Sequence, residues 1–81
     1  MTVLTADIPR KRSLTLNGHR TSISLEDAFW EALREISTRE AKSVSELVEN
    51  IDTARGDAGL SSAIRIYILQ HYRGQISSIA V

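Results

Sequence analysis

The sequence predicts a small α+β domain that is mostly helical, with an N-terminal β-hairpin followed by three helices. Three observations lead to this fold class: polar and apolar residues alternate on both sides of Asn17-Gly18, the apolar spacing becomes helical after Leu25, and a glycine-containing loop at 55–59 precedes a last apolar helix. The 81 residues leave room for one domain. The expected divisions are a flexible arm at 1–11, a folded domain at 12–73 and a tail at 74–81.

The predicted hairpin has strands at about 12–17 and 19–25. An Asn-Gly pair between two alternating segments is the strongest local signal for a type I′ turn, because both central residues of this turn need a positive φ. Residues two apart in a strand point to the same side. The second strand therefore has an apolar face, made of Thr21, Ile23 and Leu25, and a polar face, made of Arg20, Ser22 and Ser24.

The first two helices are predicted from spacing and capping. Apolar residues recur at helical intervals over 26–41, and two carboxylates at the start suit the positive end of a helix dipole. Ser43 and Glu46 form a capping-box pattern, which predicts a second, shorter helix that ends at about Ala54. On this helix an acidic face that could bind a protein partner is formed by Glu46, Glu49 and Asp52.

The third helix carries the evidence for a dimer. Ser61 or Ser62 is expected to cap it, Gly74 is expected to end it, and its residues are apolar nearly all round. Such a helix must be covered on more than one side, and a monomer of this size has little other protein to cover it. We therefore expect a homodimer, with a core made of Ile23, Leu25, Phe29, Leu33, Ile36, Ile64, Tyr67 and Ile68.

The charges are unevenly distributed along the chain. The formal net charge is zero, which by itself argues against nucleic-acid binding. Residues 1–25 include four basic residues and one acidic residue, residues 26–60 include four basic and nine acidic residues, and residues 61–81 include two basic residues and no acidic one. Basic ends around an acidic middle suggest one face for an anionic partner and another for solvent.

Several function classes lack the residues that they need. The chain has no cysteine, which excludes disulfides, thiol nucleophiles and cysteine-based zinc sites, and His19 and His71 lie in no metal-binding pattern. No glycine-rich phosphate loop and no hydrolase motif occurs, so we expect neither an enzyme nor a cofactor. No apolar stretch is long enough to span a membrane and the N-terminus does not resemble a signal peptide, so a cytoplasmic location is expected.

Two segments resemble ribbon-helix-helix proteins, the family that includes the Arc and methionine repressors. The run from Arg20 to Leu33, Arg-Thr-Ser-Ile-Ser-Leu-Glu-Asp-Ala-Phe-Trp-Glu-Ala-Leu, is similar to the start of such domains, where a short alternating strand leads directly into an amphipathic helix. The run from Gly59 to Leu69 resembles the family's second helix. The motifs at 17–22, 26–30 and 60–65 are similar to a bacterial subgroup, and the resemblance covers about residues 12–73.

The resemblance implies an intertwined ribbon-helix-helix homodimer that binds double-stranded DNA as a transcriptional repressor or autoregulator. In such proteins the strands of two chains pair antiparallel, and the ribbon enters the major groove of DNA, which is about 12 Å wide. The base-contacting residues that it implies are Arg20, Ser22 and Ser24. The phosphate-contacting residues are Ser61, Ser62 and Ala63 at a helix N-terminus, together with Arg10, Lys11 and Arg12 near the arm.

The chain departs from the simple family pattern in two places. The hairpin adds a strand before the predicted reading strand, and a four-stranded sheet would not enter a groove as a two-stranded ribbon does. The helix at 43–54 separates the two family helices, either as an ornament or as a site for a protein partner. The alternative function is therefore a protein-interaction or dimerisation module of the same fold that does not bind DNA.

Overall fold

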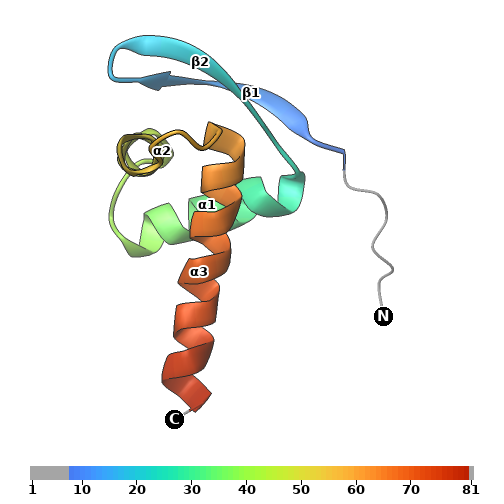
Figure 1. Ribbon diagram of the computed structural model, residues 1–81, viewed down its shortest axis with the longest axis vertical. Helices are drawn as coiled ribbons and strands as arrows, with labels where there is room; N and C mark the ends of the chain where they lie inside the picture. The colour runs from blue at the N-terminus through green and yellow to red at the C-terminus, as the bar shows by residue number, and fades with distance from the viewer. Residues whose placement is uncertain (1–7, 81) are drawn as a thin grey trace.

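The computed structural model describes residues 8–80, and it describes side chains for residues 8–75. The elements are β1 (Arg10–Leu16), β2 (His19–Leu25), α1 (Asp27–Arg39), α2 (Val44–Ala54) and α3 (Leu60–Ala80) (Figure 1). This order confirms the predicted fold class, a hairpin followed by three helices. The hairpin lies across one end of the helices, and the C-terminal part of α3 projects away from the other elements (Figure 1).

The strands β1 and β2 form a two-stranded antiparallel sheet around the predicted turn. Asn17 (φ 51°) and Gly18 (φ 82°) both have the positive φ that a type I′ turn requires. β1 begins at Arg10, earlier than predicted, so the strand includes the end of the expected arm. In this extension Arg10 pairs with Leu25, and the indole Nε1 of Trp30 donates a hydrogen bond of 3.1 Å to the carbonyl of Arg10.

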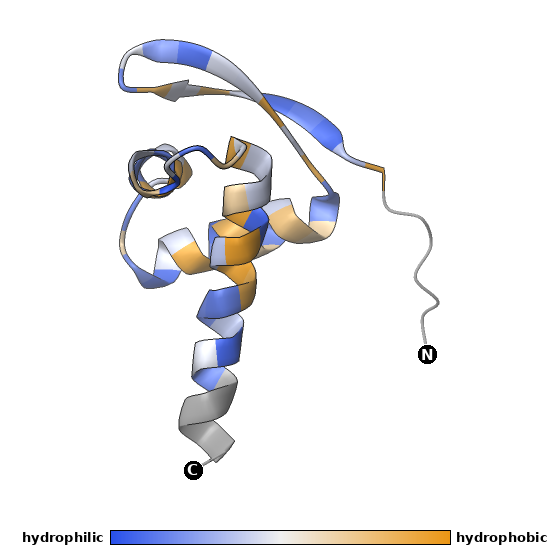
Figure 2. Cartoon of the chain, viewed as in Figure 1, coloured by the Kyte–Doolittle hydropathy of each residue, from blue (hydrophilic) through white to orange (hydrophobic). Residues whose placement is uncertain are grey.

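The hydrophobic core lies between the hairpin and the three helices. Figure 2 shows apolar residues gathered where α1 and α3 come together below a largely polar hairpin. The buried members are Leu16, Ile23, Leu25, Trp30, Leu33, Ile36, Leu47, Val48, Ile51, Ile64 and Ile68. Three of these come from α2, so this helix is part of the core and not an ornament.

Most of the residues assigned to a dimer core are already covered within one chain. Phe29 and Tyr67 are half-buried, whereas the other six are buried by α1, α2 and the hairpin. One side of α3 is therefore covered within a single chain and needs no second copy. Its other side stays open, because Ile66 and Leu69 are 52% and 54% exposed.

The connection from α1 to α2 combines an expected cap with an unexpected backbone conformation. The Ser43 side chain accepts a hydrogen bond from the amide of Glu46, and the Glu46 carboxylate accepts one from the amide of Ser43, which confirms the capping box. α1 ends at Arg39, slightly before the predicted Ala41. Ala41 has a φ of 56°, a left-handed conformation that usually belongs to glycine at this position after a helix.

Helix α3 differs from its prediction at both ends. It begins at Leu60, so neither Ser61 nor Ser62 precedes it as a cap. It continues through Gly74 to Ala80, so the prediction that Gly74 ends it is wrong. Gly74 does not have the positive φ of a C-terminal cap, and glycine inside a helix costs only about 1 kcal/mol relative to alanine. No helix within residues 8–80 is both long enough and apolar enough to cross a membrane.

Candidate nucleic-acid interface

The side of the hairpin that points away from the helices carries only polar side chains. Because residues directly opposite in an antiparallel sheet share a face, the register defines this set as Lys11 opposite Ser24, Ser13 opposite Ser22, and Thr15 opposite Arg20. We call these six residues the outer face. Ser24 is half-buried and the other five are exposed. The outer face thus has two cations, four hydroxyl groups and no carboxylate.

The opposite side of β2 packs on the helices. Ile23 and Leu25 are 2% and 0% exposed, and Thr21 is half-buried. This agrees with the division into an apolar and a polar face that the alternating sequence predicts. Arg20, Ser22 and Ser24 are consequently held on the outer face by the burial of their neighbours in the strand.

The three consecutive basic residues at the start of β1 point to different sides. The Arg10 Nε atom lies 2.9 Å from the Asp27 Oδ2 atom, and the Arg12 guanidinium lies 5.1 Å from the centre of the Trp30 ring. Both arginines therefore face α1, while the Lys11 side chain has no partner among the described residues. A predicted strand that began at Arg10 would already have placed Lys11 on one face and Arg10 and Arg12 on the other, because alternate residues of a strand point to opposite sides. Of the three basic residues predicted to contact phosphates, only Lys11 thus lies on the outer face.

The N-terminus of α3 lies beside β2. The two elements border a groove of about 360 Å³, whose lining includes Ser22 from the strand and Ser61 from the helix. The amide of Ala63 is not available to a phosphate, because it donates a 2.9 Å hydrogen bond to the Gly59 carbonyl. Among the described residues the amides of Leu60, Ser61 and Ser62 have no acceptor. The amides without an acceptor at this helix N-terminus therefore begin one residue earlier than the predicted phosphate-contacting set Ser61, Ser62 and Ala63.

An ion pair that the sequence did not reveal joins Glu26, the N-cap residue of α1, to α3. The Nε and Nη2 atoms of Arg65 donate to the Oε1 atom of Glu26 at 3.0 and 2.8 Å. These hydrogen bonds from Arg65 hold the pKa of Glu26 below its ordinary value. The Arg65 guanidinium also lies 5.6 Å from the centre of the Phe29 ring. The contact links the start of α1 to α3 and so helps to fix the hairpin relative to the helix N-terminus.

The carboxylates proposed as an acidic face on α2 all have partners within the chain. Glu46 belongs to the capping box, and Glu49 accepts a 2.8 Å hydrogen bond from the amide of Asn17 in the hairpin turn. Asp52 forms an ion pair of 2.6 Å with Arg55. These carboxylates therefore have structural roles, and Glu49 ties the hairpin to α2.

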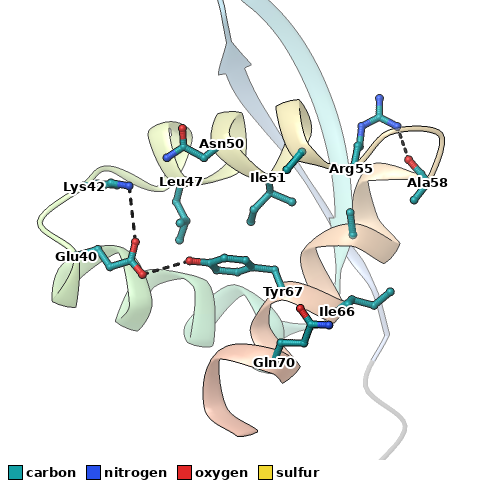
Figure 3. A pocket seen from close by; sticks show the side chains of 12 residues that line it. Glu40, Lys42, Leu47, Asn50, Ile51, Arg55, Ala58, Ile66, Tyr67 and Gln70 are labelled. Atoms are coloured by element: carbon teal, nitrogen blue, oxygen red, sulfur yellow. Dashed lines mark hydrogen bonds and ion pairs between the residues drawn. The ribbon is translucent and has the colours of Figure 1, made fainter. Parts of the chain in front are cut away.

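Two grooves run along the exposed side of α3, and Ile66 borders both. The first lies between α2 and α3, has a volume of about 410 Å³, and is lined by apolar residues such as Leu47 and Ile51 (Figure 3). At one end of it the Tyr67 hydroxyl donates to Glu40 at 3.2 Å. The second groove, of about 320 Å³, is lined by Phe29, Arg65, Ile66, Ile68, Leu69 and Tyr72. Within the described residues no group of three or more His, Asp or Glu could hold a metal ion.

Comparison with known proteins identifies the family. The family model described as a ribbon-helix-helix domain matches residues 9–72. No match was found among curated proteins or among solved structures. Ribbon-helix-helix domains are in general dimeric DNA-binding modules of transcription regulators and are typically not enzymes. Because the match covers most of the 81 residues, the chain belongs to the ribbon-helix-helix family.

Proposed function

We propose that the protein is a homodimeric, sequence-specific DNA-binding protein that acts as a transcriptional repressor or autoregulator in the bacterial cytoplasm. The observation that carries the proposal is the outer face, where Lys11 and Arg20 have no side-chain partner among the described residues and no carboxylate lies beside them. In a protein of zero net charge, this is a local surface suited to a polyanion.

The open edge of β2 is the better candidate for pairing with a second chain. Leu16 and His19 flank the two-residue turn and exchange backbone hydrogen bonds, so the backbone groups of Arg20, Ser22 and Ser24 point away from β1. An unpaired edge of this kind readily pairs with another strand. The open edge of β1 is less suited, because it follows Pro9 and carries consecutive charged residues, which discourage such pairing.

The edge of β2 also defines a register for the dimer. In antiparallel pairing through the backbone groups of Arg20, Ser22 and Ser24, the Ser22 residues of the two chains lie opposite each other on the two-fold axis. Arg20 of each chain then lies opposite Ser24 of the other. The two arginines are then four residues apart along the strands, or about 14 Å at roughly 3.4 Å per residue. Since successive nucleotides of one strand rise by about 3.4 Å, they would contact guanines about four base pairs apart.

The test is a selection from random duplexes at several salt concentrations. We expect a palindromic motif with two guanines on opposite strands about four base pairs apart. Arg20→Ala should lose this preference, at a cost of about 1–3 kcal/mol for each bidentate contact. Arg34→Ala is the matched control, since Arg34 is exposed on α1 and lies outside the outer face. If no duplex binds even at low salt, the proposal is wrong.

The alternative is a protein-interaction module that does not bind DNA. The exposed Ile66 and Leu69, between the two grooves on α3, favour some contact with another protein chain. A second copy of this chain is consistent with both functions, because it would cover these residues in a DNA-binding dimer as well. The same selection decides between the two, since only the DNA-binding protein enriches a motif.

A further inference from the structure

The strand β1 has no role in a two-stranded reading ribbon, yet half of the outer face belongs to it. Lys11, Ser13 and Thr15 lie on the same side of the sheet as the three outward residues of β2. In the proposed dimer the order of strands becomes β1, β2, partner β2, partner β1. The outer face then doubles in area and includes four cations.

We propose that β1 is a second DNA-contacting strand, and that Lys11, Ser13 and Thr15 bind the phosphates on the two walls of the major groove while β2 faces the bases. This inference rests on the proposed DNA binding and adds a position and a role for the extra strand. It also explains how a four-stranded sheet can lie on a groove that it is too wide to enter fully.

The widths of the sheet and the groove agree. Neighbouring strands are about 4.8 Å apart, so the two β2 strands fit side by side within a groove about 12 Å wide. The two β1 strands are three spacings apart, or about 14 Å. Each β1 strand therefore lies over one wall of the groove, where the phosphates are, and not over the base pairs.

The chemistry of β1 suits phosphates. The Lys11 ammonium is a compact charge on a flexible stem, which binds phosphate oxygens without the planar geometry that guanine recognition requires. Ser13 and Thr15 are exposed, and hydroxyl groups are common donors to phosphates. The neighbours Arg10 and Arg12 point to α1, where Asp27 and Trp30 contact them. Of the three consecutive basic residues, only Lys11 is therefore on the outer face, where it can contact DNA.

The experiment measures how the dissociation constant depends on salt, on the selected duplex and on an unrelated one. Each phosphate contact contributes about 0.9 to the slope of log K against log salt, so Lys11→Ala should reduce the slope by about 2 per dimer. The reduction should be equal on both duplexes, and Lys11→Arg should restore most of it. Two control variants should leave the slope unchanged. Lys42→Ala removes the only other lysine of the chain, and Arg10→Ala removes the basic residue next to Lys11.

The outcomes separate this inference from the proposed function. If the wild-type protein binds its motif but Lys11→Ala has the wild-type slope, the role of β1 is wrong while DNA binding stands. An equal loss of slope in Arg10→Ala would also overturn it, because the side of the strand would then not matter. If the wild type binds no duplex, the proposed function itself fails. The fluorescence of the single, buried Trp30 verifies that each variant is folded.

Discussion

Replacing Ser22 by cysteine should link two chains covalently. In the proposed register the two Ser22 residues form a hydrogen-bonded antiparallel pair, whose Cα atoms are about 5.5 Å apart. A disulfide needs Cα atoms about 4.4–6.8 Å apart, so mild oxidation should convert most of the Ser22→Cys protein into a linked dimer. The chain has no cysteine of its own, so any disulfide involves the introduced residue.

The matched control is Ser13→Cys, at the position opposite Ser22 in the hairpin. If β2 pairs with β2, the two Ser13 residues are separated by three strand spacings, or about 14 Å, and cannot form a disulfide. Non-reducing gel electrophoresis at micromolar concentration measures both variants. If Ser13→Cys links and Ser22→Cys does not, the chains pair through β1, and if neither links, the shared sheet is wrong.

Three further predictions concern the stability of the fold, and the fluorescence of Trp30 in urea measures each of them. Leu33→Ala should lower the free energy of unfolding by about 2–5 kcal/mol, because Leu33 is 0% exposed; a loss below 1 kcal/mol would mean that the core is packed differently. Ala41→Gly should raise it by about 0.5–1 kcal/mol, because glycine removes the strain of a positive φ; destabilisation would contradict the conformation of this turn. The hydrogen bonds from Arg65 lower the pKa of Glu26 in the folded state. The ionised Glu26 therefore stabilises the fold at pH values above its ordinary pKa of 4.5, and this stabilisation is lost as the pH falls through the lower pKa of the folded state. Glu26→Gln should therefore weaken the fall in stability below pH 4.5, and an unchanged acid profile would show that the pair contributes nothing.

The sequence predicted the part of the proposed DNA-binding surface that lies on β2, but only Lys11 of the part that lies on β1. Arg20, Ser22 and Ser24 follow from alternation beside an Asn-Gly turn, a pattern that acts over a few residues. The separation of Lys11 from Arg10 and Arg12 required the true start of β1. At that start Arg10 pairs with Leu25 and its carbonyl accepts a hydrogen bond from Trp30, contacts between residues far apart in the sequence. Ser13 and Thr15 alternate with Leu14 and Leu16 inside the predicted first strand, so alternation also places them on a polar face, but the resemblance directed the site prediction to β2 alone.

The sequence by itself determined the order of elements, the turn at Asn17-Gly18, the capping box at Ser43 and the two faces of β2. These features depend on backbone preferences and on contacts within one turn or strand. Only the tertiary structure decided that α2 belongs to the core, that its carboxylates have partners within the chain, and that α3 passes through Gly74. It also decided that one chain covers only one side of α3, because burial depends on which elements pack together, and local spacing does not specify that.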